Sequence, residues 1–277
     1  MVGNLVRPLL RRKSAAIMGI INTTPDSFSD GGKYDSLDNA VRHGLRLSQE
    51  GADILDVGGE STRPGAEVVG VQEELDRVLP VIEKLVSCTD TPISIDTYKP
   101  KVMKAAVQAG AQMVNDVYGL RADNALSVVA QLSVPVCIMH MQGRPKTMQA
   151  EPNYTDVVSE VVGFCNQQVE SSVEAGIARS DLLFDPGIGF GKTLAHNLLL
   201  LRNIDKIRSS TECEILIGVS KKSFIQKQLG REVADRVPAS LGLAVQSVLS
   251  GAKIVRVHDV RATYDAIRMV EAVSDAK

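Results

Sequence analysis

Apolar and polar positions fall into alternating blocks along the chain, and the apolar blocks predict strands. Most of these short runs, rich in Ile, Val, Leu and Met, are continuous, which is typical of strands buried on both faces of a parallel sheet. Amphipathic stretches between them predict helices. The expected strands are residues 15–21, 52–57, 92–95, 111–114, 134–139, 181–184, 214–219 and 253–257, and the clearest expected helices are 36–50, 72–85, 100–109, 156–175, 238–250 and 261–272.

The spacing of these strands favours one closed barrel. Their centres lie about 34 residues apart, which is the length of one βα unit. The chain has 277 residues, close to the size of a (β/α)8 barrel. Neither a composition shift nor a Gly/Ser-rich linker marks a second domain. We therefore predict a single α/β domain of the TIM-barrel type over residues 15–275, with residues 1–14 as an N-terminal extension; an open doubly wound sheet is the alternative.

Composition and charge narrow the classes of partner. The chain is 44% hydrophobic and 23% charged, as folded globular proteins are, and its net charge of −2 provides no overall field for nucleic acid or an anionic membrane. The four cysteines show neither a C-x-x-C pair nor zinc-site spacing. No early apolar run is long enough for a signal or membrane segment. We expect a cytoplasmic protein with no nucleic-acid or membrane partner.

Polar residues follow every expected strand. In a barrel, strand ends meet at the face that carries active sites, so these residues predict one site. Turn formation and helix capping are the alternative explanation. The residues are Asn22, Asp56, Asp96, Asn115 with Asp116, His140, Asp185, Ser220 with Lys221 and Lys222, and Arg256 with His258.

Long loops are expected on the same face, after the first, second and fifth strands. They cover residues 22–35, 58–71 and 140–155. Such lengths are unusual in a compact domain and favour a mobile lid, with surface variation as the alternative.

Two carboxylates and an amide suggest a flat, N–H-rich ligand. Asp96, Asn115 and Asp185 provide acceptors for several donors on one heterocycle. Lys221 or Lys222 provides a cation beside them. Because side chains alternate along a strand, one of the two lysines faces inward, and the sequence leaves open which one.

A second group suggests a phosphate-like anion. Arg63, Arg256 and His258 combine cationic donors, and Arg256 and His258 lie two positions apart on the last strand. The alternative to an anion site is that these three side chains form ion pairs with acidic residues on the surface. Asn22 offers an oxygen that suits Mg²⁺ shared with diphosphate. The segment at residues 185–193 lacks the spacing of either a P-loop or a dinucleotide-binding loop, so a nucleotide site is not expected.

Long motifs add a family resemblance. They are MGIINTTPDSFSDGG (18–32), DVGGESTRPG (56–65), IDTYKP (95–100), Asn115 with Asp116, MHMQG (139–143), DPGIGFGK (185–192), SKKS (220–223) and RVH (256–258). In this order and spacing, over most of the chain, they resemble the bacterial dihydropteroate synthases.

The resemblance implies a fold, a reaction and partners. The fold is a (β/α)8 barrel, and the enzyme is a cytoplasmic transferase of folate biosynthesis that is usually a homodimer. It condenses 6-hydroxymethyl-7,8-dihydropterin diphosphate with 4-aminobenzoate, using Mg²⁺ as cofactor, and gives 7,8-dihydropteroate and diphosphate. Sulfonamides compete with 4-aminobenzoate. We expect dissociative C–O cleavage followed by attack of the amine on the pterin methylene. Mg²⁺ and the cationic residues would stabilise the negative charge on the diphosphate, and the pterin-site carboxylates the positive charge on the methylene.

The resemblance also assigns residues. The pterin site is expected to contain Asp96, Asn115, Met139, Asp185, Phe190 and Lys222, and the diphosphate site Asn22, Thr62, Arg63, Arg256 and His258. The aminobenzoate site is expected to contain Phe28, Thr62, Pro64, Phe190, Lys222 and Ser223. Asn22 is the expected metal ligand, and the expected catalytic residues are Asp185, Lys222, Arg256 and Asn22.

One position departs from the pattern, and other functions stay open. Lys221 stands where the family usually has Arg, so a bidentate contact there is in doubt. The alternatives are a pterin-dependent methyltransferase barrel with a corrinoid partner, an aldolase using Lys221 or Lys222 as a Schiff base, and a non-catalytic pterin-binding barrel.

Overall fold

Eight parallel strands close into a barrel in which each strand pairs with the next along the chain and β8 returns to β1. The computed structural model describes residues 3–24, 33–62, 65–144 and 147–276. The strands are β1 (Ala16–Asn22), β2 (Ile54–Gly58), β3 (Ile93–Asp96), β4 (Met113–Asp116), β5 (Val136–Met139), β6 (Leu182–Asp185), β7 (Glu214–Gly218) and β8 (Ala252–Val257). The predicted barrel, with long connections after β1, β2 and β5, is confirmed, and the open sheet is excluded.

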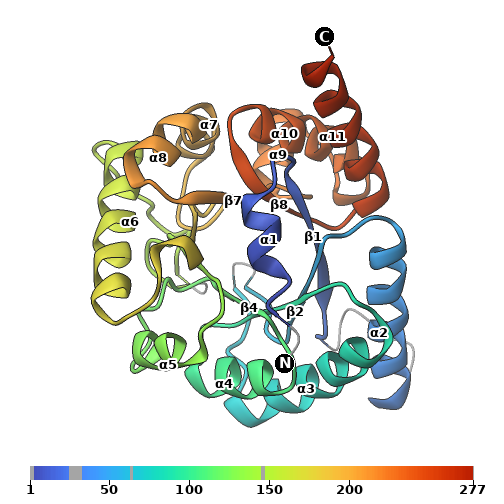
Figure 1. Cartoon of the computed structure of the whole chain (residues 1–277). Helices are drawn as coiled ribbons and strands as arrows, with labels where there is room; N and C mark the ends of the chain where they lie inside the picture. Colours follow the sequence, from blue (N-terminus) through green and yellow to red (C-terminus); the bar gives the residue numbers. More distant parts are fainter. Residues whose placement is uncertain (1–2, 25–32, 63–64, 145–146, 277) are drawn as a thin grey trace.

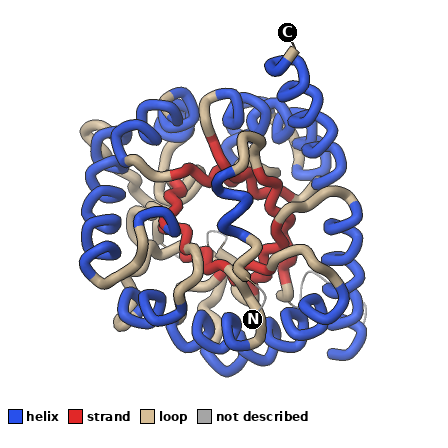
Figure 2. Tube along the Cα trace, in the orientation of Figure 1, coloured by secondary structure: helices blue, strands red, loops and turns tan. Residues whose placement is uncertain are grey.

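Helices form the outer ring (Figure 2). The ring consists of α2 (Lys33–Gln49), α3 (Val71–Cys88), α4 (Pro100–Gln108), α5 (Ala125–Leu132), α6 (Val157–Glu174), α7 (Leu194–Arg202), α8 (Ile204–Thr211), α9 (Ser223–Leu229), α10 (Val237–Leu249) and α11 (Val260–Asp275), with short 3-10 turns at Arg179–Asp181 and Val233–Arg236. A further helix, α1 (Val6–Arg11), lies inside this ring. Periodicity indicated the longer helices but missed α1, α5, α7, α8 and α9. These have six to nine residues, and so few turns give only a weak repeat, although α4, also of nine residues, was indicated.

Side chains alternate along each strand between two apolar layers. Ile17, Leu55 and Val255 belong to the layer that packs against the helices. Met18, Ile54 and Ile254 belong to the core inside the barrel, with Met113 and Leu183. Because alternate residues share a face, the residues two positions further along these strands also face inward. The barrel mouth above this core is therefore lined by Asp56, Asn115, Asp185 and Arg256.

Helix α1 fills the opposite end of the barrel, and Figure 1 shows it lying across the barrel axis. Val6 and Leu10 are buried in the inner core with the first residues of the strands. Arg7 Nη2 contacts Asp181 Oδ2 at 2.8 Å, and Arg12 Nη1 contacts Asp53 Oδ1 at 2.7 Å. The segment expected to be an extension thus contains a helix packed into the barrel.

Replacing Leu10 by alanine is expected to destabilise the protein without changing catalysis. Leu10 is 9% exposed, and its loss leaves a cavity that costs about 2 to 3 kcal/mol of unfolding free energy. Urea unfolding and steady-state kinetics check this, with Leu229→Ala as the control because Leu229 is 55% exposed. A lower kcat/KM in a folded Leu10→Ala enzyme would contradict the separation of the two barrel ends.

Within the described part of the chain, no helix combines the length and the apolar character that spanning a bilayer requires.

Candidate active site

Arg256 joins two carboxylates at the barrel mouth. Its Nε donates to Asp56 Oδ2 and its Nη2 donates to Asp96 Oδ2, each at 2.6 Å. Asn115, the register partner of Asp96 on β4, donates from Nδ2 to Asp56 Oδ2 at 3.2 Å. Side chains of β2, β3, β4 and β8 thus form one network. Asp56 was expected at this face of the barrel but was given no role in the site, and closure of the barrel, which turns Ile54 and Asp56 of β2 inward, brings it into the network.

Burial controls the charges in this network. Desolvation, with a smaller contribution from nearby Asp56, raises the pKa of Asp96 to about 7 against the opposing effect of Arg256. Burial alone would lower the pKa of Arg256, but the two carboxylates raise it overall, so the guanidinium stays charged. Asp56 Oδ1 and Asp96 Oδ1 are buried and accept no hydrogen bond from a described residue. Such acceptors favour a ligand that brings N–H donors.

Asp185 and Lys222 form the other wall of the mouth. Asp185 Oδ1 accepts the Gly187 N–H at 2.7 Å, and burial raises the pKa of this carboxyl although Gly187 and Lys222 oppose the shift. Lys222 Nζ donates to Ile188 O at 2.9 Å. The same Nζ lies 4.2 Å from the centre of the Phe190 ring. Burial lowers the pKa of Lys222 to about 8. Asp185 therefore provides an acceptor beside a cation and an aromatic face.

The structure answers which lysine faces the site. Lys221 has a φ of 55° and its Nζ contacts Asp259 Oδ1 at 3.0 Å. Lys222 is the residue directed toward Asp185 and Phe190. At the position where the resemblance leads one to expect Arg, the Lys221 ammonium makes this ion pair.

Glycines at residues 187–191 serve close packing between two backbone segments. A Cβ on Gly187 would lie 1.8 Å from His140 O, and one on Gly191 would lie 2.6 Å from Gln142 O. Both glycines have positive φ. The close approach is therefore to the chain after β5.

The predicted anion residues that the structure describes lie at or beyond the ends of β1, β2 and β8. Asn22 and Thr62 are half-buried. His258 follows β8, and its Nδ1 lies 3.0 Å from Ser220 Oγ. Gly58 O accepts hydrogen bonds from Thr23 N at 2.8 Å and Thr23 Oγ1 at 3.1 Å, which join the starts of the first two long loops. Arg256 is engaged by carboxylates, so Arg256 and His258 do not form an isolated anion clamp in this state.

For five of the predicted binding residues, the described structure gives only burial and position, or lies elsewhere in the chain. Met139 is buried, as the register partner of Asp185 on β5. Ser223 is exposed at the start of α9. The predictions for Phe28, Arg63 and Pro64 lie outside the described residues.

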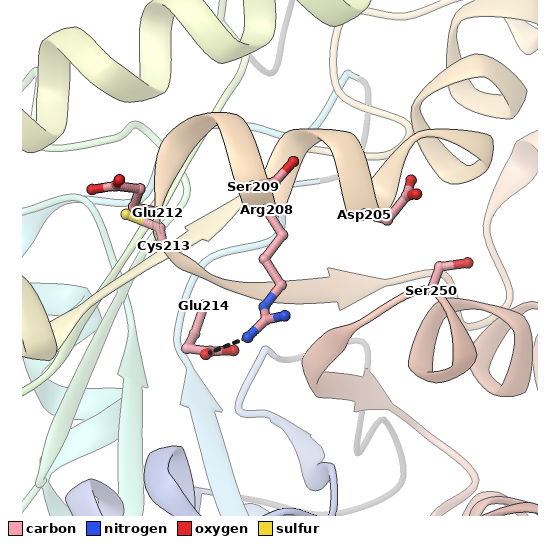
Figure 3. Close-up of a pocket in the computed structure, with 7 residues that line it drawn as sticks. All are labelled: Asp205, Arg208, Ser209, Glu212, Cys213, Glu214 and Ser250. Carbon is pink, nitrogen blue, oxygen red and sulfur yellow. Dashed lines mark hydrogen bonds and ion pairs between the residues drawn. The ribbon is translucent and has the colours of Figure 1, made fainter. Parts of the chain in front are cut away.

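A separate pocket of about 290 Å³ lies between α8 and the start of β7 (Figure 3). Its side chains are mainly polar, and Arg208 Nη2 contacts Glu214 Oε1 at 3.0 Å across it. It lies where β7 begins, so it is remote from the carboxylate network at the strand ends.

Comparisons with known proteins agree with this geometry. A family model described as pterin binding enzyme matches residues 18–258. The chain belongs to this pterin-binding enzyme family. A dihydropteroate synthase of Escherichia coli (strain K12) is 47% identical over 261 residues, covering 94% of this chain and 92% of the relative. Membership therefore extends to the dihydropteroate synthases within the family.

Solved structures give the same result. A dihydropteroate synthase of Xanthomonas albilineans with 4-aminobenzoic acid has a TM-score of 0.91 and 48% identity, covering 96% of this chain and 95% of that one. A Yersinia pestis dihydropteroate synthase in a sulfonamide complex has a TM-score of 0.90 and 46% identity, covering 95% of each chain. The family and fold expected from the sequence motifs are confirmed.

Proposed function

We propose that this chain condenses 6-hydroxymethyl-7,8-dihydropterin diphosphate with 4-aminobenzoate, forming 7,8-dihydropteroate and releasing diphosphate. The observation that carries the proposal is the set of buried acceptors, Asp96, Asn115 and Asp185, that surround one barrel mouth beside Arg256 and Lys222. This set matches a pterin, whose edge carries several N–H donors. Family membership supports the same activity.

Pterin recognition is assigned to both walls of the mouth. Asp185 is buried and accepts one backbone N–H, and its carboxylate is proposed to accept N–H groups of the pterin. Asp96 and Asn115 would bind the ring from the opposite side. Phe190 and Met139 would contact its faces, and Lys222 would donate to a ring acceptor. A ring that lacks these donors leaves buried carboxylates unpaired, which is the basis of selectivity.

Diphosphate binding is assigned to Asn22, Thr62, Arg63, Arg256 and His258. Arg256 would exchange part of its contact with Asp96 for a diphosphate oxygen, and its planar fork suits both acceptors. Cations placed at the leaving group stabilise the negative charge that grows as the C–O bond breaks.

Mg²⁺ fits this end of the site through Asn22. The amide oxygen of Asn22, at the end of β1, is a hard ligand of the kind that Mg²⁺ prefers. Mg²⁺ commonly uses few protein ligands, together with phosphate oxygens and water. The described residues contain no group of three or more His, Cys, Asp or Glu that could hold a metal by themselves, and the diphosphate of the substrate is proposed to complete the shell. When bound, Mg²⁺ supplies positive charge that stabilises the diphosphate.

Amine capture follows from positioning. The dihydropterin methylene becomes electron-poor as diphosphate departs, and the carboxylates of Asp96 and Asp185 stabilise its positive charge. The aminobenzoate nitrogen attacks as a neutral amine, so it needs alignment rather than prior deprotonation, and the ammonium that forms then releases one proton to water or to the departing diphosphate. Phe28, Thr62, Pro64, Phe190, Lys222 and Ser223 are proposed to form its pocket, where sulfonamides would compete.

Incubation with dihydropterin diphosphate, labelled 4-aminobenzoate and Mg²⁺ tests the activity. We expect labelled dihydropteroate and one equivalent of diphosphate. A sulfonamide should inhibit competitively with 4-aminobenzoate, and chelation of Mg²⁺ should reduce turnover. Methyl transfer to a corrinoid, or pterin binding without product, would instead favour one of the alternative functions. A cytoplasmic location and a homodimer stay predictions, and light scattering of the purified protein tests the second.

A further inference from the structure

Lys192, which no part of the proposed mechanism uses, lies buried behind the pterin wall. It is 1% exposed, and its Nζ lies 3.0 Å from His140 Nδ1 and 2.9 Å from Phe190 O. His140 directly follows β5, whereas Phe190 belongs to the loop after β6. One amine therefore connects the exits of two neighbouring strands.

The loop that carries Phe190 is held through its carbonyl groups. Four successive carbonyls, those of residues 188–191, each accept a hydrogen bond from a side chain. The donors are Lys222 Nζ to Ile188 O at 2.9 Å, Gln149 Nε2 to Gly189 O at 2.6 Å, Lys192 Nζ to Phe190 O at 2.9 Å and Tyr154 Oη to Gly191 O at 2.9 Å. Glycines contribute little rigidity of their own, so these bonds set the conformation of the loop.

Electrostatics agree with this connecting role. Burial, together with the charge of Lys192, lowers the pKa of His140 to about 2, so the imidazole is neutral. Burial lowers the pKa of Lys192 to about 7, and the charge of Asp185 opposes that shift. Below this pKa Lys192 is charged and can only donate, so His140 Nδ1 accepts and His140 Nε2 carries the proton. Lys192 also holds down the pKa of the Asp185 carboxyl.

We propose that Lys192 is a positioning residue of the pterin site. It fixes the loop at residues 187–191 to the end of β5, and acts on the substrate only through Phe190 and Asp185. The proposal rests on the proposed function, because its effect is measured on pterin binding.

Kinetics of Lys192→Met test the proposal, because methionine keeps the apolar length but removes the N–H donors and the charge. We expect KM for the dihydropterin diphosphate to rise at least about tenfold, with kcat changed by less than about threefold. Lys227→Met is the matched control, since Lys227 is an exposed lysine on α9. A folded Lys192→Met enzyme with the wild-type KM would overturn the proposal.

A spectroscopic measurement keeps the test independent of folding of the variant. In ¹⁵N-histidine spectra of the wild-type protein near pH 5.5, below the pKa of Lys192, His140 should have an unprotonated Nδ1 and a protonated Nε2. In Lys192→Met this tautomer preference should weaken. The opposite tautomer in the wild type would refute the assignment even if Lys192→Met did not fold.

The two proposals fail in distinguishable ways. Absence of dihydropteroate formation by the wild-type enzyme would refute the proposed function. Normal wild-type turnover with a wild-type KM in Lys192→Met would refute the role of Lys192 alone.

Discussion

Replacing Asp185 by asparagine is expected to lower kcat/KM for the pterin substrate by about 2 to 4 kcal/mol of transition-state stabilisation, or about 30- to 800-fold. Asparagine is nearly the same size, but its NH₂ group is a donor where the pterin also presents donors. Asp185 is 7% exposed, so water cannot relieve the mismatch. Lys222 would also lose the carboxylate charge beside it. Steady-state kinetics with varied dihydropterin diphosphate measure the effect.

Asp181→Asn is the matched control for this substitution. Asp181 precedes β6, so it lies at the opposite end of that strand, and it is equally buried. Its partner is Arg7 on α1. We expect Asp181→Asn to reduce stability while leaving kcat/KM near the wild-type value. Equal kcat/KM in wild type and Asp185→Asn would exclude Asp185 from pterin recognition.

Replacing Arg256 by methionine is expected to abolish most activity and to lower the unfolding free energy by about 3 to 5 kcal/mol at pH 8. Two buried carboxylates, those of Asp56 and Asp96, lose their shared cation. Asp56 is fully buried, so of the two donors described at its carboxylate only the Asn115 amide would remain. Urea unfolding of the wild type and the variant measures the loss.

The stability loss should depend on pH in a defined direction. The pKa of Asp96 is about 7 in the folded protein and about 3.9 in an unfolded chain. Between these values the folded state binds more protons, so the contribution of Asp96 to stability decreases as pH rises. Removing Arg256 raises this pKa further and extends the decrease above pH 7. The loss in Arg256→Met should therefore be smaller at pH 5.5 than at pH 8.

Two further variants isolate the cause. Arg256→Lys keeps the charge but cannot bridge Asp56 and Asp96 with two N–H groups, so its stability should fall between those of wild type and Arg256→Met. Adding Asp96→Asn to Arg256→Met should recover part of the loss at pH 8. A pH-independent loss that Asp96→Asn does not relieve would show that packing, rather than charge, explains the effect.

The amino-acid sequence by itself determined the barrel and the residue types at its mouth. Continuous apolar runs marked the strands because both faces of a parallel barrel strand are buried. Their regular spacing, with polar residues such as Asp96 and Asp185 at the ends, predicted one catalytic face. The motifs then identified the family, since long exact runs preserve both residue type and order.

Only the tertiary structure decided which of these side chains meet. Arg256 and Asp56 are 200 residues apart, and their contact depends on closure of β8 against β1 and on the register around the barrel. Lys221 and Lys222 differ in direction because Lys221 adopts a positive φ, which local composition does not reveal. The sequence shows that side chains alternate between the two faces of each strand. Which face points toward the barrel axis is fixed only when the strands close into the barrel.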